Sequence, residues 1–167
     1  MNDASEVVAV KCEDFLRDNP HLYAHKAKRK KIALISVEAG NRDSTEIRIG
    51  LGTAKLRIGE QGYAVESPGL IIRKFSDFTW DFLVYSILVF QPVLVVVDAF
   101  FFLTGPLYNR RLRKQLHLLS DGEMVLRPGE SMKAILGFRG VSKAPTQLHL
   151  LCRGNSGERL EIPCDIR

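Results

Sequence analysis

Apolar and polar residues alternate in several short runs that lie on both sides of one long apolar stretch. Between residues 45 and 51 the apolar positions alternate with charged ones, which predicts a half-buried strand. The pattern returns at residues 56–58 and 63–65 on either side of a Gly-Glu-Gln-Gly turn, so these residues predict a hairpin. Residues 32–37 are apolar at almost every position, and they predict a strand that is buried on both faces.

The C-terminal third has the same alternation. Residues 124–126 lead into Pro128-Gly129, a pair typical of the two central positions of a type II turn, and residues 132–138 predict the following strand. A last hairpin around a loop at residues 155–157 has one register that keeps a face apolar. That register pairs Cys152 with Leu160, Leu150 with Ile162 and Leu148 with Cys164. It also places Cys152 and Cys164 too far apart for a disulfide.

The N-terminal segment has a looser apolar pattern. Its apolar residues would lie on one side of a helix, so the pattern predicts a short helix over residues 4–17. Asn19 and Pro20 then resemble an N-cap and a first helical position, and they predict a basic helical segment that runs to about residue 30.

The six or seven predicted strands fit one antiparallel sandwich that is split by an insertion. The alternative is two β units of about 50 residues each, which would be marginal on their own. We therefore expect a mainly β protein: a small antiparallel Ig-like β-sandwich interrupted by a hydrophobic helical hairpin, with a short N-terminal helix. The expected segments are an N-terminal helical, basic-ended segment (1–30), the first half of the sandwich (31–77), a hydrophobic membrane-associated insert (78–108) and the second half of the sandwich (109–167).

The insert carries the strongest signal in the chain. Residues 82–104 contain one charged residue, Asp98. A straight helix of that length would measure about 34 Å, against a hydrocarbon core of about 30 Å. Pro92 removes a helical hydrogen bond and pushes Gln91 away from helical geometry, which leaves two arms too short to cross a bilayer. We therefore expect a hairpin that dips into the membrane and returns.

Basic residues flank the insert on both sides. If the strands before and after it belong to one sandwich, its two ends emerge on the same side, and the positive-inside rule makes that side cytoplasmic. The bases expected to contact lipid headgroups are Arg73, Lys74, Arg110, Arg111, Arg113 and Lys114. The residues expected to represent the membrane insert are Trp80, Phe82, Leu83, Leu88, Phe90, Pro92, Val96, Asp98, Phe101 and Leu103.

The charge balance adds a second basic segment. The chain has 24 Lys and Arg against 19 Asp and Glu, and residues 26–31 hold five bases in six positions. Such a run is either a solvated face or a binding site for a polyanion, since nucleic acids and anionic lipids both attract it. This run contains no interleaved aromatic residues that could stack on the nucleobases of a single strand, so we expect that the protein does not bind nucleic acid.

Signs of redox or catalytic chemistry are missing from the sequence. The N-terminus lacks the basic region of a secretory signal, and the three cysteines form no C-x-x-C pair, so free thiols in a reducing compartment are expected. Gly50-Leu51-Gly52 lacks the third glycine of a dinucleotide loop and predicts a bulge or a close strand approach. His21 and His25 are one helical turn apart without a third metal ligand. We therefore expect no enzyme, metal or cofactor.

The order of these features resembles a group of uncharacterised bacterial envelope proteins. The shared features are a strand pair, a long apolar insert, a basic exit, a Leu-Arg-Pro-Gly-Glu-Ser turn and a closing hairpin, over residues 31–166. The resemblance implies a small β-sandwich with a hydrophobic helical insert and no catalytic residues. We expect a non-enzymatic protein that binds the lipid bilayer and another envelope or membrane protein. The alternatives are a nucleic-acid-binding module using residues 26–31 and a soluble lipid carrier with a buried apolar hairpin.

Overall fold

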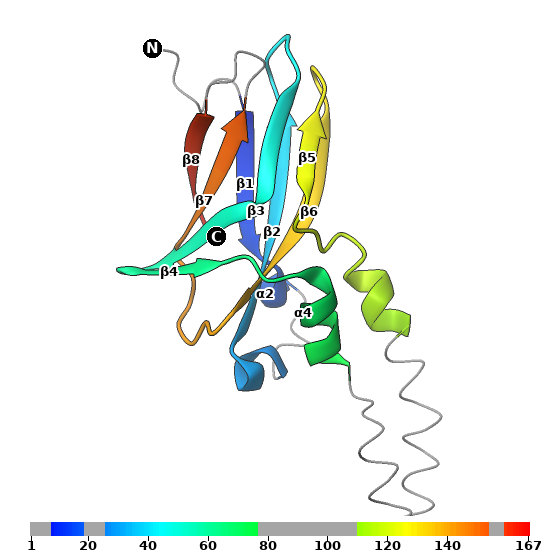
Figure 1. Ribbon diagram of the computed structural model, residues 1–167, viewed down its shortest axis with the longest axis vertical. Helices are drawn as coiled ribbons and strands as arrows, with labels where there is room; N and C mark the ends of the chain where they lie inside the picture. Colours follow the sequence, from blue (N-terminus) through cyan, green and yellow to red (C-terminus); the bar gives the residue numbers. More distant parts are fainter. Residues whose placement is uncertain (1–7, 19–25, 77–109, 154–158) are drawn as a thin grey trace, which may run out of the picture. The chain divides into compact units, whose positions relative to one another are not determined.

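Two antiparallel β-sheets packed against each other form the β-sandwich of this protein (Figure 1). The computed structural model describes residues 8–18, 26–76, 110–153 and 159–167. Sheet A has the strand order β1-β2-β6, and sheet B has the order β4-β3-β7-β8, with β5 also paired to β3. The strands are β1 (Val8–Asp14), β2 (Ile32–Asn41), β3 (Ile47–Ile58), β4 (Gln61–Ala64), β5 (Glu123–Leu126), β6 (Ser131–Arg139), β7 (Gln147–Arg153) and β8 (Arg159–Asp165). The prediction of a mainly β, sandwich-like protein is confirmed.

One apolar core lies between the two sheets, because alternate residues of each strand point toward the facing sheet. Val37 and Leu136 contribute to it from sheet A, and Leu56 and Leu150 from sheet B, all with no exposed surface. The outer face of β2 is covered as well, so residues 32–37 are buried on both faces, as predicted. Sheet A therefore has a second apolar face, on the side away from sheet B.

Strands from both sides of the predicted insert interleave in the same sheets. β2 pairs with β6, so that Ile35 lies opposite Leu136, and β3 pairs with both β5 and β7. The chain therefore builds one sandwich from its two halves, and the alternative of two separate β units is excluded.

Several local predictions are confirmed residue by residue. β3 and β4 form the expected hairpin. The turn before β6 has the amide of Glu130 bonded to the carbonyl of Arg127, with Gly129 at φ +73°, as a type II turn requires. The last hairpin adopts the predicted register, in which Cys152 lies opposite Leu160, and the two remaining apolar pairs follow. All three cysteines are free.

The predicted helix over residues 4–17 is wrong for residues 8–14. These residues form β1, which pairs with β2 from Val8 opposite Asn41 to Asp14 opposite Ile35, and among the described residues of this segment only α2 (Phe15–Asp18) is helical. Val8, Val10 and Cys12 alternate with more polar positions, and β-branched residues favour a strand when a partner edge is present. The exposed edge of β2 supplies that partner.

β3 is one continuous strand where the sequence predicted two short ones. Its register to β7 shifts between Gly50 and Lys55, which is the bulge expected at the Gly-Leu-Gly segment. The predicted close approach is present too, because a Cβ atom at Gly52 would clash with the carbonyl oxygen of Asp121. The bulge thus lets the strand continue past the backbone of the segment that precedes β5.

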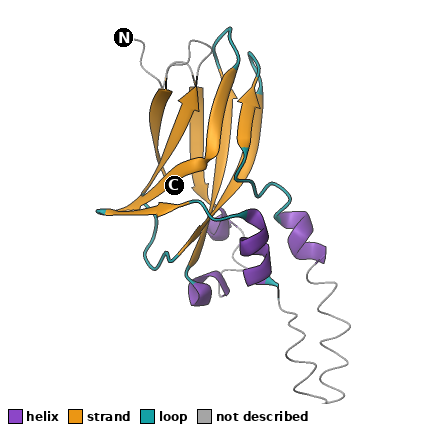
Figure 2. Ribbon diagram, in the orientation of Figure 1, coloured by secondary structure: helices purple, strands orange, loops and turns teal. Residues whose placement is uncertain are grey.

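The helices are short. α4 (Pro68–Phe75) follows β4, and residues 26–30 and 110–115 are also helical. α2 and residues 26–30 lie at the end of the sandwich strands opposite the β2–β3 and β5–β6 turns (Figure 2). The chain divides into two compact units, residues 1–71 with 118–167 and residues 72–117. Within the described part of the chain, every helix is too short or too polar to span a bilayer.

Candidate membrane-docking surface

α4 carries the first pair of basic residues expected at headgroups. The carbonyl of Ser67 accepts the amides of Leu70 and Ile71, and Pro68 occupies the first helical position, where its missing N–H costs little. Ile71 and Phe75, one turn apart, are completely buried, whereas Arg73 and Lys74 are exposed in the last turn. Cations in this position are favoured by the partial negative charge of the helix C-terminus.

Residues 110–115 repeat this arrangement after the insert. Leu112 and Leu116 are buried one turn apart, and the amide of Leu116 donates to the carbonyl of Leu112. The four bases of this segment are exposed on the remaining faces of the helix. All six predicted headgroup residues are therefore described and exposed, and all belong to the unit of residues 72–117. The ten predicted insert residues, from Trp80 to Leu103, lie outside the described residues.

The chain segments before and after the insert contact neighbouring positions of β6, through Ile71 and Leu118. Ile71 packs on Gly137 so closely that a Cβ atom at Gly137 would lie 2.6 Å from its Cγ1. On the returning chain, the carbonyl of Leu118 accepts the amide of Ile135 at 2.9 Å. Residues 135 and 137 share the outer face of sheet A and are about 7 Å apart along the strand. The chain thus leaves and rejoins the sandwich at nearly the same place.

A second set of basic residues lies where β2 begins and β6 ends in sheet A, and no local pattern in the sequence predicts that its members meet. Ile32 lies opposite Arg139 in the β2–β6 ladder, and the amide of Val141 donates to the carbonyl of Lys31 at 3.0 Å. The predicted basic run of residues 26–31 therefore lies beside the loop that carries Lys143. The two segments are far apart in the sequence, and only the β2–β6 register brings them together, so their proximity could not be predicted.

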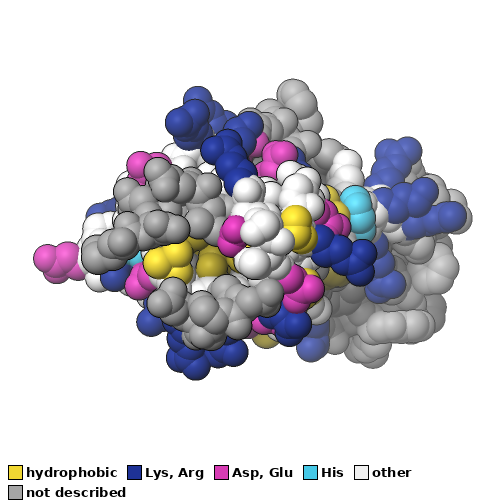
Figure 3. Space-filling model, turned by 90° about the horizontal axis from the view of Figure 1, so that it is seen from above, with side chains coloured by type: hydrophobic (Ala, Val, Ile, Leu, Met, Phe, Trp, Pro, Cys, Tyr) yellow, Lys and Arg dark blue, Asp and Glu magenta, His cyan; other side chains and the backbone are white. Residues whose placement is uncertain are grey.

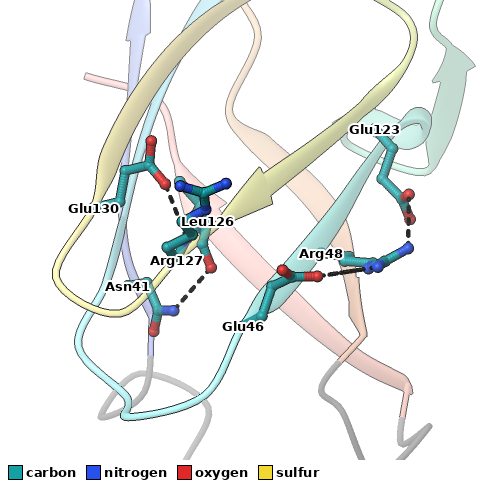
Figure 4. Close-up of polar contacts among 7 residues, drawn as sticks. All are labelled: Asn41, Glu46, Arg48, Glu123, Leu126, Arg127 and Glu130. Carbon is teal, nitrogen blue, oxygen red and sulfur yellow. Dashed lines mark hydrogen bonds and ion pairs between the residues drawn. The ribbon is translucent and has the colours of Figure 1, made fainter.

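The opposite end of the sandwich has paired charges. Arg48 contacts Glu46 at 3.0 Å and Glu123 at 3.8 Å, and a carboxylate oxygen of Glu130 accepts the amide of Arg127 (Figure 4). Seen from that end, acidic and basic side chains are interspersed (Figure 3).

Two cysteine thiols lie together where β1 and β8 approach each other. The hydrogen bond between them raises the pKa of Cys12, reinforced by burial, and lowers the pKa of Cys164. They line a cavity of about 540 Å³ between the two strands, and the amide of Arg167 closes one end by donating to the carbonyl of Cys12. Burial alone raises the pKa of the third thiol, Cys152, to about 11. Protonated thiols are poor nucleophiles, so neither Cys12 nor Cys152 is activated for covalent chemistry.

The histidines do not assemble a catalytic or metal site in the part that can be described. His149 contacts Glu161 at 2.6 Å on the polar face of the last hairpin, and His117 contacts the carbonyl of Lys114. The predicted pair His21 and His25 lies outside the described residues. Among the described residues, no cluster of three or more His, Cys, Asp or Glu side chains could hold a metal ion.

Comparisons with known proteins place this chain in no family. No protein-family model matches the sequence, and no curated protein matches it either. Among solved structures, the chain is similar to the "Putative ApaA Protein" from Bordetella pertussis, with 12% sequence identity and a TM-score of 0.38. The match covers 94% of this chain and 85% of the other.

Proposed function

We propose that this protein is a non-enzymatic, membrane-associated β-sandwich of the Ig-like type, anchored by a hydrophobic helical hairpin formed by residues 78–108. The observation that carries the proposal is the proximity of Ile71 and Leu118, which contact β6 two residues apart. A single membrane crossing would separate its two ends by the thickness of the bilayer, about 30 Å. A hairpin that enters and returns leaves both ends on one side.

The exposed bases next to the insert fit this orientation. Arg73 and Lys74 precede the apolar stretch, and four further bases follow it. Basic residues on both flanks favour the cytoplasmic side under the positive-inside rule, and each one gains about 1 kcal/mol near an anionic surface. In this proposal the insert fixes the orientation of the sandwich, whose sheets and loops then bind another envelope or membrane protein.

Flotation with neutral phosphatidylcholine vesicles tests the anchor in the full-length chain. We expect the wild type to float with the vesicles and the variant Leu88→Asp/Val96→Asp to remain in the dense fraction, because each buried charge costs about 2.5–3.5 kcal/mol in the bilayer centre. The matched control is Met132→Asp/Leu160→Asp, which places the same charges at exposed positions of the sandwich. Equal flotation of the two variants would refute the anchor.

The same-side orientation has its own test. Cys12 and Cys152 are buried, so reporters must be introduced at exposed positions, one before the insert at Arg42 and one after it at Ser142. We expect a membrane-impermeant thiol reagent to spare both cysteines in intact cells and to label both after permeabilisation. Labelling of one position alone in intact cells would contradict the hairpin. A wild-type protein recovered as a lipid-free soluble monomer would contradict the membrane role, and one recovered in solution with bound lipid would support the carrier alternative.

A further inference from the structure

We propose that a basic surface on the sandwich binds the phosphate groups of anionic lipid headgroups. This surface, the β6-end basic surface, consists of Lys28, Arg29, Lys31, Arg139 and Lys143. The inference rests on the proposed function and extends it. The anchor would then have a second, electrostatic contact that lies on the sandwich itself.

Two segments more than a hundred residues apart build the surface. The amide of Val141 donates to the carbonyl of Lys31, and the β2–β6 ladder places Arg139 opposite Ile32. All five side chains are exposed, and neither the 26–31 segment nor the 139–143 segment contains an acidic residue. No ion pair joins the five bases to a carboxylate in the described parts of the chain. Their charges are thus available to an external anion.

The surface continues along β6 from the residue on which Ile71 packs. Gly137, on which Ile71 packs, and Arg139 are two residues apart on β6 and therefore share the outer face of sheet A. The side chain of Arg139 lies about 7 Å further along the strand. The proposed anchor would bring a membrane to this protein, and the positive charges of the surface complement an anionic membrane, which is why we assign the surface to lipid rather than to another polyanion.

The local backbone conformation also singles out Lys31. It is the one non-glycine residue with a positive φ, +53°, among the described residues, and it ends the helical turn of residues 26–30. Glycine or asparagine normally occupies this left-handed position, because a Cβ atom makes it costly. Strained positions are often functional, and we infer that the charge of Lys31 has a role.

A nucleic acid is the alternative ligand for this cluster of five basic residues. Single-stranded nucleic acids stack on exposed aromatic rings, and the ring that packs near this surface, against Gly140, belongs to Tyr63. Tyr63 is only partly exposed, and its hydroxyl donates to Gln61 at 2.8 Å. An acidic residue, Glu66, also lies near the surface in the fold, since its amide donates to the carbonyl of Gly137. We therefore treat nucleic-acid binding as an outcome of the test.

The test compares two variants that lose three positive charges each. Lys31→Gln/Arg139→Gln/Lys143→Gln removes charge from both segments of the surface, and the matched control Arg42→Gln/Arg127→Gln/Arg153→Gln removes it from exposed positions at the opposite end. The full-length proteins are titrated with vesicles of pure phosphatidylcholine and with vesicles that contain one third phosphatidylserine. Thermal unfolding of both variants confirms that they are folded.

We expect the wild type to bind the phosphatidylserine vesicles more tightly than the neutral ones. Each charge near an anionic membrane is worth about fivefold in affinity, so the surface variant should lose about 100-fold on these vesicles and nothing on neutral vesicles. The control variant should stay within about threefold of the wild type. Equal losses in the two variants would overturn the proposal while leaving the anchor intact.

Two further results separate the possible explanations. If the wild type binds no neutral vesicle, the anchor fails, and the basic surface is then judged by the anionic vesicles alone. If a single-stranded RNA competes with the vesicles at equal phosphate concentration, and its binding is lost in the surface variant, the surface belongs to a nucleic acid and our assignment is wrong. Inorganic phosphate at the same concentration should not displace the protein, because a single phosphate lacks the multivalent contact of a lipid surface.

Discussion

The side-chain amide of Asn41 in sheet A donates a hydrogen bond of 3.0 Å to the main-chain carbonyl of Leu126 in sheet B (Figure 4). Asn41 is buried, and the same amide also donates to the carbonyl of Thr45 at 2.7 Å, while its oxygen accepts the amide of Asp43. One side chain therefore ties the β2–β3 turn to β5 across the two sheets. Such a buried amide, with all its hydrogen bonds made, stabilises the structure mainly because its removal would leave buried partner groups without hydrogen bonds.

Replacing this amide should destabilise the protein. Asn41→Ala leaves two carbonyls and one amide without their partner, and we expect the free energy of unfolding to fall by about 2 kcal/mol. Asn41→Asp keeps the size but turns a donor into an acceptor facing two carbonyl oxygens, so its cost should be larger at pH 7 and smaller at pH 4, where a protonated acid can donate. Urea unfolding at the two pH values measures both effects. A smaller cost for Asn41→Asp than for Asn41→Ala at pH 7 would contradict this assignment.

The contact between Gly137 and Ile71 predicts a second stability effect. Gly137→Ala places a methyl group 2.6 Å from Cγ1 of Ile71, and overpacking of this kind costs about 1–3 kcal/mol. Ile71→Ala removes the Cγ1 atom that the new methyl group meets, so the double variant should lose less stability than the sum of the two single variants, with a coupling of at least about 0.5 kcal/mol in a double-mutant cycle. Gly62→Ala is the control, because nothing lies within 4 Å of its added Cβ atom. Strictly additive losses would show that the two residues do not press on each other.

Lys31 should show opposite effects on stability and on lipid binding. Lys31→Gly removes the Cβ atom from a left-handed position, and we expect the free energy of unfolding to rise by about 1 kcal/mol. The same variant loses one charge of the β6-end basic surface and should bind phosphatidylserine vesicles about fivefold more weakly. Lys28→Gly, in the helical turn just before, is the contrast and should lower stability. If Lys31→Gly also lowers stability, the left-handed backbone is not strained.

The buried thiol of Cys152 makes stability sensitive to alkaline pH. Burial raises its pKa to about 11 from the usual value of about 9, so the folded protein holds this proton more tightly than the unfolded chain. The resulting stabilisation is complete below pH 9 and is lost as the pH rises from about 9 to about 11. Unfolding at pH 8 and pH 10.5 should show a smaller drop for Cys152→Ala than for the wild type. Equal drops would show that the thiol does not titrate in this range.

The sequence predicted best where structure depends on neighbours in the chain. The register of the last hairpin follows from the alternation around its loop, since a one-residue slip would mix its apolar and polar faces. The turn at Pro128-Gly129 and the bulge at Gly50 depend on local backbone preferences as well. These features came out as predicted because the residues that decide them lie within a few positions of each other.

The errors and omissions involve distant partners. Residues 8–14 have an ambiguous pattern, and only the edge of β2, more than twenty residues later, selects a strand over a helix. The thiol pair of Cys12 and Cys164 could not be foreseen, because it depends on how β1 of one sheet meets β8 of the other. The same holds for the candidate site: its flanking bases were predicted from the chain, but the meeting of Lys31 with Val141 was not.

The interleaved strand order also determines when the protein can fold. β2 and β3 leave the ribosome before the apolar stretch, but their partners β5, β6 and β7 are made only after it. Pairings between such distant segments form late, and until then the early strands keep open edges that can aggregate. Until β7 has been synthesised, β2 and β3 therefore lack these partners, and a factor that assists the nascent chain has to shield their open edges.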